Sequence, residues 1–226
     1  MNILITGASK GLGEAYAKYI GRTSDTLYLV SRTKPNTLEL QDQVQRIWLK
    51  ADLTAPDVHE KIVAQVPELD VLIHNAGTWE STAFSRDYQF EAVPEAETRS
   101  IIELNLTAPI LLTQAFLPML KYSSNPRIIL IGSINGLENA AMSEVAYNAT
   151  KFGLRGVAHS LRETLRQDRI GVTIINPGSI GWDGNVSTDF LIPPIDIVNL
   201  TRTILEMSRQ TVVKEIDMPA MQDTQV

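Results

Sequence analysis

Seven short apolar runs alternate with longer helical patterns along almost the whole chain, and this alternation restricts the possible folds more than any other feature. The runs are rich in Val, Ile and Leu without strict polar alternation, which is typical of strands covered on both faces. They occupy residues 2–6, 26–31, 46–53, 70–77, 127–133, 171–178 and 212–218. Strands that alternate with helices indicate βαβ units and a parallel sheet, and right-handed crossovers place helices on both faces.

The segments between the runs have helical periodicity, at residues 11–21, 38–44, 56–66, 95–121, 145–168 and 195–209. We therefore predict a Rossmann-like, doubly wound α/β fold, with a mainly parallel seven-stranded sheet in the middle of three α/β/α layers. No linker or repeat divides the chain, so residues 1–226 are expected to form one domain. Pro118 predicts a kink or an end near Leu117 in the 95–121 helix, and Pro109 argues against one continuous helix there.

The composition excludes several classes of function. The 26 acidic residues outnumber the 20 basic ones, and the net charge of −6 does not favour binding to nucleic acid or to an anionic membrane. There are no cysteines, and the three histidines lack partners at metal-ligand spacing, so no metal site is predicted. His74, inside an apolar run, is expected to be a core residue. Neither a leader peptide nor an apolar run of about 18 residues is evident, so a cytoplasmic protein is expected.

The first apolar run ends in the glycine-rich sequence TGASKGLG, at residues 6–13, where a helical pattern begins. A strand, a tight turn and a helix N-terminus form a cradle for a pyrophosphate. Gly7 would permit the turn, Gly11 would let phosphates approach the backbone, and Gly13 would let helix and strand pack closely. The sequence lacks the Gly-Lys-Ser/Thr ending of a P-loop, which disfavours a nucleoside-triphosphate hydrolase.

The end of the second run predicts which dinucleotide is bound. An acidic residue there would accept a hydrogen bond from a free ribose 2′-hydroxyl, whereas a basic residue accommodates a 2′-phosphate. This chain has Arg32 and Lys34 at that point, and Lys10 lies within the glycine turn. We therefore predict NADP(H) rather than NAD(H).

Tyr147 and Lys151 lie four residues apart in a helical pattern, so their side chains share one face of the helix. The pair alone is more typical of a solvated surface. In this chain, however, it follows the other features in a specific order. From residue 3 to about 217 the chain resembles the short-chain dehydrogenase/reductase family in its single-domain form. The resemblance lies in TGASKGLG, Asp52-Leu53, the Asn-Ala-Gly at 75–77, ELNLTAP around Asn105, LIGSINGL around Ser133, Tyr-x-x-x-Lys at 147–151, and Pro177-Gly178.

This resemblance implies an NADPH-dependent oxidoreductase that reduces a ketone or aldehyde to an alcohol, or the reverse. The implied catalytic residues are Asn105, Ser133, Tyr147 and Lys151. The implied cofactor-binding residues are Gly7, Ser9, Lys10, Gly11, Leu12, Gly13, Arg32, Asp52, Leu53, Asn75, Ala76, Gly77, Tyr147, Lys151, Pro177, Gly178 and Ile180. It also implies a homodimer or homotetramer.

Tyr147 would be the general acid/base. The Lys151 ammonium is expected to bring the phenol pKa from near 10 toward 7 or 8, and Ser133 is expected to donate a hydrogen bond to the substrate oxygen. From the resemblance alone, Asn105 is expected to hold a water linked to Lys151.

One position departs from the family pattern: Trp182 stands where a threonine near the nicotinamide is common. Trp79, Trp182 and Phe190 are candidates to line the substrate pocket, in the two long loops at 78–94 and 179–194. Nothing in the sequence selects one carbonyl substrate.

Two other functions remain as alternatives. One is a catalytically silent NADP(H)-binding regulator that senses redox state, although such a protein has no use for all four catalytic residues. The other is an epimerase or dehydratase, which usually adds a substantial C-terminal domain.

Overall fold

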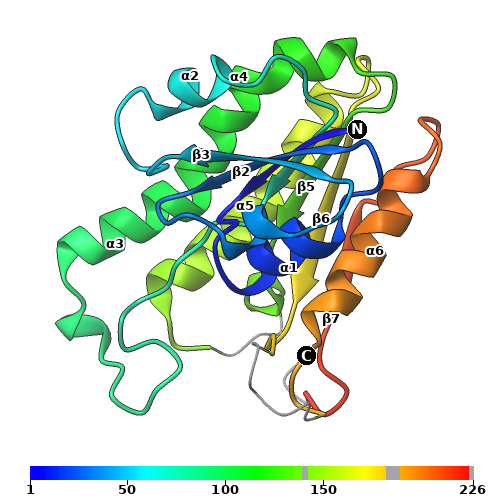
Figure 1. Ribbon diagram of the computed structural model, residues 1–226. Helices are drawn as coiled ribbons and strands as arrows, with labels where there is room; N and C mark the ends of the chain where they lie inside the picture. Colours follow the sequence, from blue (N-terminus) through cyan, green and yellow to red (C-terminus); the bar gives the residue numbers. More distant parts are fainter. Residues whose placement is uncertain (139–141, 182–188, 224–226) are drawn as a thin grey trace.

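A computed structural model describes residues 1–138, 142–181 and 189–223, and its centre is one sheet of parallel strands (Figure 1). The strands are β1 (Asn2–Thr6), β2 (Thr26–Ser31), β3 (Gln45–Lys50), β4 (Val71–His74), β5 (Arg127–Ile131), β6 (Gly171–Pro177) and β7 (Glu215–Met218). Their order in the seven-stranded sheet is β3-β2-β1-β4-β5-β6-β7. The prediction of a doubly wound parallel sheet is confirmed, and the predicted bounds of β2 coincide with the observed ones.

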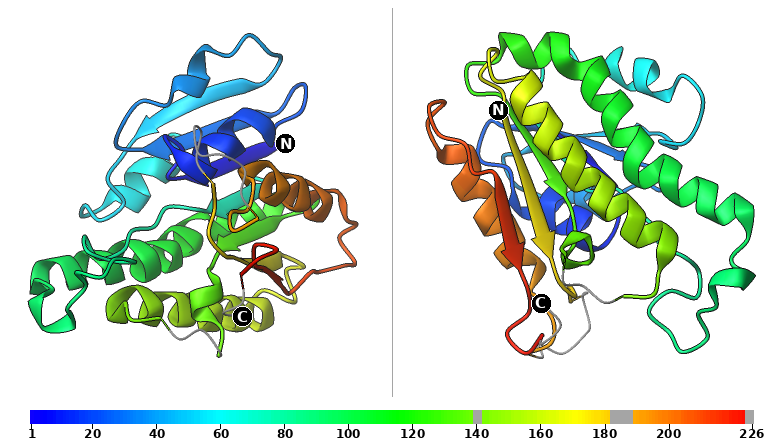
Figure 2. Two further views of the ribbon diagram at one scale, coloured as in Figure 1. Left: turned by 90° about the horizontal axis from the view of Figure 1, so that it is seen from below. Right: turned by 180° about the vertical axis from the view of Figure 1, so that it is seen from behind.

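Helices cover both faces of this sheet (Figure 2). They are α1 (Gly11–Tyr19), α2 (Val58–Val63), α3 (Glu95–Ile102), α4 (Ala108–Tyr122), α5 (Val145–Thr164) and α6 (Pro194–Glu206). The π-helical segment η3 (Glu103–Thr107) joins α3 to α4, and short 3₁₀ segments occur at η1 (Asn36–Glu39), η2 (Phe90–Ala92) and η4 (Ile134–Gly136). The helix predicted at 38–44 is therefore wrong: a single 3₁₀ turn lies there instead.

Two buried clusters hold the three layers together. One contains side chains of α2, α4 and α5 on one face of the sheet, and the other contains side chains of α1 and α6 on the opposite face. Strand residues alternate between the clusters: Leu4 and Leu72 face the first, whereas Ile3 and Ile73 face the second. All four are almost fully buried, which is why the strands read as continuous apolar runs in the sequence.

The strand order reverses between β1 and β4. Each is paired with the other, while β2 continues the sheet on one side and β5 on the other. In open α/β sheets, ligands bind outside the carboxyl ends of the strands at such a switch point. The glycine turn follows β1, and the Asn-Ala-Gly segment follows β4, so the topology brings the two together at this edge.

Two prolines lie in the long helical stretch, and the π segment agrees with the expectation that Pro109 argues against one continuous helix. Pro109 lies in the first turn of α4, directly after the π segment. Having no N–H, it leaves the carbonyl of Asn105 without its i+4 donor, which favours a loosened turn at Asn105. The helix does not end near Leu117 as one reading of Pro118 predicted, because α4 continues through Pro118 to Tyr122. Pro118 is exposed, and buried Phe116 and Leu120 hold the helix against the core.

By length and composition, one helical stretch among the described residues could also cross a membrane, over Glu95–Tyr122. Its apolar side chains are divided between two faces. Leu112, Phe116 and Leu120 are buried in the core, whereas Ile110 and Leu111 are about 40 % exposed. The buried set accounts for part of the hydropathy as core packing, and the exposed pair leaves an apolar stripe on the outer face.

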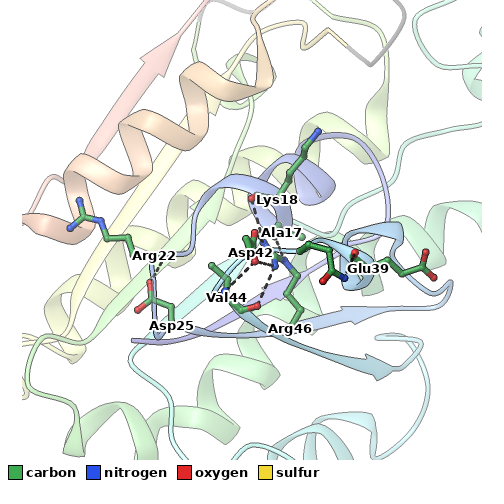
Figure 3. Close-up of polar contacts among 9 residues, drawn as sticks. Ala17, Lys18, Arg22, Asp25, Glu39, Asp42, Val44 and Arg46 are labelled. Atoms are coloured by element: carbon green, nitrogen blue, oxygen red, sulfur yellow. Dashed lines mark hydrogen bonds and ion pairs between the residues drawn. The ribbon is translucent and has the colours of Figure 1, made fainter.

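Arg46 of the edge strand β3 fastens the end of α1 to the sheet (Figure 3). Its guanidinium forms a two-point ion pair with Asp42, at 2.6 and 2.8 Å, and donates to the carbonyl oxygens of Ala17 (2.8 Å) and Lys18 (3.4 Å). A cation at the last carbonyls of a helix satisfies acceptors that have no intrahelical partner. The hydrogen bonds from Arg46 also hold the pKa of the Asp42 carboxyl below its ordinary value.

His74, at the end of β4, is a core residue as predicted: it is 3 % exposed and its Nε2 lies 2.8 Å from the Thr113 hydroxyl. Burial lowers the pKa of His74 from 6.5 to about 3. The unfolded chain therefore binds a proton below pH 6.5 that the folded chain does not, so stability falls as pH decreases from 6.5 toward 3.

We expect the wild type to lose about 2 kcal/mol more stability than a His74→Gln variant between pH 7 and pH 5, from about 1.4 kcal/mol per pH unit. Urea unfolding at the two pH values measures the difference. Equal losses of stability for the wild type and the variant would contradict a lowered pKa for His74.

Candidate active site

The glycine turn after β1 has the geometry of an anion cradle. Gly7 and Gly11 adopt φ angles of +70° and +56°, which disfavour residues with a side chain. A Cβ atom at Gly13 would lie 2.0 Å from the carbonyl oxygen of Gly7, so the start of α1 lies directly against the turn. The side chain of Lys10, the N-cap residue of α1, makes no capping hydrogen bond. The turn and helix dipole therefore present backbone N–H groups suited to a pyrophosphate.

Asn75, at the end of β4, binds this turn to the neighbouring strand. Its side-chain amide donates to the carbonyl oxygen of Thr6 at 3.0 Å, and its main-chain N–H donates to the Thr6 hydroxyl at 3.0 Å. The N–H of Ala76 donates to the same hydroxyl at 3.0 Å. The two predicted cofactor segments are thus joined across the switch point by direct hydrogen bonds.

Arg32 follows β2 and is exposed, as expected for a residue that contacts a ligand phosphate. Its positive charge lies close enough to Asp52 to affect it. Hydrogen bonds from the main-chain N–H and hydroxyl of Thr54 hold the pKa of the Asp52 carboxyl below its usual value, and the charge of Arg32 acts in the same direction. The structure therefore brings Arg32 and Asp52, distant in sequence, close enough for their charges to interact.

Tyr147 and Lys151 lie on the first two turns of α5, and the Lys151 Nζ is 5.4 Å from the centre of the Tyr147 ring. The Lys151 ammonium is buried and donates to the carbonyl oxygen of Ile131, at the end of β5, at 3.0 Å. Ser133, two residues further along, is hydrogen-bonded to the Tyr147 hydroxyl and accepts from the N–H of Asn135 at 3.2 Å. The serine and lysine predicted from the sequence therefore both lie beside Tyr147.

Asn105 joins the same group from the π segment η3. Its amide oxygen accepts from the N–H of Thr78 at 2.8 Å, and its amide nitrogen donates to the Thr78 carbonyl at 2.7 Å and to the Thr150 hydroxyl at 3.1 Å. Thr150 in turn donates to the carbonyl oxygen of Tyr147 at 2.7 Å. A Cβ at Gly77 would contact both the Asn105 Oδ1 and the Lys151 Nζ. Asn105 therefore ties the segment after β4 to the tyrosine turn, and its expected water remains a prediction.

The expectation that Lys151 brings the Tyr147 pKa toward neutral is wrong for the protein chain itself. Burial raises the pKa of Tyr147 above 10, the hydrogen bond with Ser133 lowers it, and the negative charges of Glu144 and Glu80 raise it further. Burial also lowers the pKa of Lys151 to about 8. Desolvation opposes the charged form of both groups, and it is the largest effect on the Tyr147 pKa. Lys151 is still mostly protonated at pH 7.

Three aromatic rings meet at the tyrosine. Trp79 and Phe84 each lie edge-to-face with Tyr147, at centroid separations of 6.3 and 5.6 Å, and with each other at 5.8 Å. Trp79 and Phe84 are 44 % and 51 % exposed, so they form an open apolar wall beside the phenol. Trp79 was a predicted pocket residue, whereas Phe84 was missed, since its φ of +60° and its contacts have no sequence signature.

Two buried carboxylates beside the tyrosine were also missed. Glu80 and Glu144 are 1 % and 4 % exposed. The Glu80 Oε1 accepts from the N–H groups of Ala146 (2.9 Å) and Tyr147 (3.4 Å). A Glu directly before a helical pattern is the one available signal, and it identifies only Glu144.

The structure describes residues 178–181 of the segment after β6, and then residue 189 onward. Pro177 ends the strand, the N–H of Gly178 donates to the carbonyl oxygen of Met218 at 2.9 Å, and Ile180 forms an isolated bridge with Ile192. Trp182 lies outside the described residues. Phe190 is 63 % exposed, and the ring contacts at Tyr147 do not include it. Within the described residues, no cluster of His, Asp or Glu could hold a metal ion.

Comparison with known proteins agrees with this geometry. The short chain dehydrogenase family matches residues 1–188 of the chain. A relative in Nostoc sp., a ketoacyl reductase, is 28 % identical over 212 residues, which cover 89 % of this chain and 71 % of the relative.

Solved structures share the fold. An alcohol dehydrogenase from Thermococcus sibiricus, complexed with 5-hydroxy-NADP, superposes with a TM-score of 0.86 at 22 % identity, covering 100 % of this chain and 99 % of that one. A short-chain oxidoreductase of metagenomic origin, in complex with NADP, superposes with a TM-score of 0.79 at 27 % identity, covering 96 % and 97 %.

Proposed function

We propose that this chain, which belongs to the short-chain dehydrogenase family, is an NADPH-dependent oxidoreductase. It would reduce a ketone or aldehyde to an alcohol, or catalyse the reverse reaction. The observation that carries the proposal is the convergence of Ser133, Tyr147 and Lys151 at the carboxyl edge of the sheet, with Asn105 bonded to the same turn. NADPH oxidation that requires an added carbonyl compound, and that stops when Tyr147 loses its hydroxyl, tests it.

The residues present fit a nicotinamide dinucleotide. The turn at 7–13 would hold the pyrophosphate, because α1 begins directly against it and the N–H groups in the first turn of a helix have no intrahelical partner. Asp52 and Asn75 would lie at the adenosine, and Gly178 and Ile180 at the nicotinamide. When bound, the dinucleotide supplies or accepts the hydride.

The chain's own residues then manage the proton. In reduction, the Tyr147 phenol donates its proton to the carbonyl oxygen, and the Ser133 hydroxyl supplies a second hydrogen bond to that oxygen. Because burial keeps Tyr147 protonated in the chain itself, the site is prepared to act as an acid. Lys151, held by the Ile131 carbonyl, places a positive charge near the phenolate that remains.

We expect Arg32→Ala to weaken NADPH binding by about 10- to 100-fold and to change NADH binding by less than about two-fold. A charge-assisted hydrogen bond is worth roughly 1.5–3 kcal/mol, and only NADPH carries the 2′-phosphate. Fluorescence titration of both coenzymes, with wild type and variant, measures this. The prediction of NADPH preference is contradicted if the wild type binds NADH at least as tightly as NADPH. It is also contradicted if Arg32→Ala weakens the binding of both coenzymes equally.

The substrate pocket begins at the wall of Trp79 and Phe84, which favours an apolar group attached to the carbonyl carbon. A ketoacyl reductase among the relatives makes 3-oxoacyl thioesters the first substrates to examine.

We also propose a cytoplasmic homodimer or homotetramer, in which Ile110, Leu111 and the 44 % exposed Phe152 are covered by a second copy.

A further inference from the structure

We propose that Glu80 and Glu144 are positioning residues for Tyr147: their carboxylates fasten the loop after β4 to the start of α5 and favour the protonated phenol. The kinetic part of this inference rests on the proposed reductase function, whereas the structural part does not. Both glutamates are buried, at 1 % and 4 % exposure.

The two carboxylates connect the same two segments in opposite directions. Glu80, from the loop, accepts from the N–H groups of Ala146 and Tyr147 in the first turn of α5. Glu144, the residue before α5, accepts from the N–H of Phe84 in the loop, at 2.8 Å. This crossed pair of carboxylate hydrogen bonds is hereafter called the latch. The bonds from Glu80 satisfy two N–H groups in the first turn of α5, which have no intrahelical partner.

The loop also satisfies the rest of the helix start. The N–H of Val145 donates to the Tyr88 hydroxyl at 3.1 Å, and the N–H of Asn148 donates to the Glu144 carbonyl at 3.0 Å. The first four N–H groups of α5 are therefore all occupied, three of them by side chains of the loop. The backbone of Tyr147 cannot move relative to this loop without breaking at least one of these bonds.

The latch also holds a strained residue. Phe84 is not a glycine, yet its φ is +60°, a conformation that is rare for a bulky side chain and persists only where the surroundings enforce it. The Glu144 carboxylate bonds the N–H of this residue. The strained backbone places the Phe84 ring 5.6 Å from Tyr147, so the same bond determines the position of the aromatic wall.

Each carboxylate retains one oxygen without a hydrogen-bond partner among the described residues, Oε2 in both cases. An unpaired buried carboxylate oxygen is costly, and capping alone would be achieved as well by an amide or a hydroxyl. Two such groups beside one phenol therefore indicate a role for their charge. That role is to oppose a second negative charge, the phenolate.

The charged groups around Tyr147 come from the loop after β4 and from α5. The loop after β4 contributes Glu80, the start of α5 contributes Glu144, and the next turn of α5 contributes the Lys151 ammonium. Ser133, from the end of β5, contributes a neutral hydrogen bond, and Trp79 and Phe84 contribute apolar rings. The two negative charges raise the pKa of Tyr147, after the larger effect of burial. Together they favour the proton-donating form used in carbonyl reduction.

The test separates charge from hydrogen bonding. Glu80→Gln keeps an oxygen that accepts the α5 N–H groups but removes the charge. Tyr147 is followed in the cofactor-free protein through the Cζ signal of ¹³C-labelled tyrosine, identified by its absence in Tyr147→Phe. We expect the Tyr147 titration to move about one pH unit lower in Glu80→Gln, from a charge–charge interaction at intermediate dielectric. The pH at which alcohol oxidation rises is expected to move in the same direction.

Glu80→Ala removes both charge and hydrogen bonds. It is expected to lower turnover at every pH and to broaden the Tyr147 signal, and Glu80→Gln is expected to restore the narrow signal. Glu91→Gln is the matched control, because Glu91 is an exposed charge of the same loop and should shift nothing. The inference is overturned if Glu80→Gln titrates like wild type, or if Glu80→Ala is indistinguishable from wild type. Absence of turnover with an intact titration shift would instead reject only the reductase.

Discussion

Replacing Tyr147 with Phe is expected to lower kcat for carbonyl reduction by about a thousand-fold while leaving NADPH affinity within about two-fold of wild type. General acid catalysis by a positioned side chain typically contributes 10²- to 10⁴-fold. The substitution removes only the hydroxyl and its hydrogen bond with Ser133. The remaining ring can keep its edge-to-face contacts with Trp79 and Phe84, so the pocket wall and the fold should persist.

Steady-state assays and a coenzyme titration on the same preparation measure both quantities. A variant that retains more than about a tenth of wild-type kcat would show that Tyr147 is not the acid. A variant that no longer binds NADPH would show that the tyrosine supports the cofactor site instead. The matched control is Tyr19→Phe, which removes a hydroxyl from a tyrosine at the far end of α1 and should leave kcat unchanged.

Gly13→Ala is expected to cost about 3 kcal/mol of stability or more, and to weaken NADPH binding beyond detection. The added Cβ would lie 2.0 Å from the carbonyl oxygen of Gly7 and 2.7 Å from the side-chain amide of Asn75. Overpacking in a close-packed interior costs about 1–3 kcal/mol, and more where the obstructing atom belongs to the backbone. The turn must open to admit the methyl group, so its N–H groups lose their arrangement around the pyrophosphate.

For a chain of this length, that cost corresponds to a decrease in Tm of about 6–12 °C. Gly156→Ala provides a matched control, because it adds the same methyl group in α5, where no atom beyond the neighbouring helix backbone lies within 4 Å of the new Cβ. Replacing an exposed helical glycine with alanine should stabilise the folded protein by about 0.5–1 kcal/mol. If Gly13→Ala unfolds like wild type and binds NADPH normally, the close contact between turn and helix does not matter for function.

Local patterns determine the parts of this structure that the sequence predicts well. Strand β2 and the glycine turn are recognisable because each depends on residues adjacent in the chain: a run of Leu, Tyr and Val, or glycines at fixed spacing. The parallel order follows from alternation of strands and helices. Tyr147 and Lys151 share a face because helical geometry requires it. The positions of Asn105 and Ser133 came from family resemblance rather than from spacing.

The latch could not be predicted, because its hydrogen bonds join residues 60 or more positions apart in the sequence. No local pattern indicates that an oxygen of Glu80 will reach the start of α5. The pKa of Tyr147 was mispredicted for a related reason. Its main cause is burial, which depends on how completely the loop and the strand ends enclose the phenol. The continuation of α4 through Pro118 likewise depends on the packing of Phe116 and Leu120.

We propose above all that this site transfers hydride between NADPH and a carbonyl carbon. The most direct measurement incubates the purified protein with NADPH that carries deuterium at both C4 positions of the nicotinamide and with a panel of ketones, aldehydes and 3-oxoacyl thioesters. The products are then examined by mass spectrometry. We predict an alcohol that carries one deuterium on the former carbonyl carbon, formed in step with NADPH oxidation. Tight NADPH binding with no deuterated alcohol from any member of the panel would contradict the claim and favour a cofactor-binding regulator.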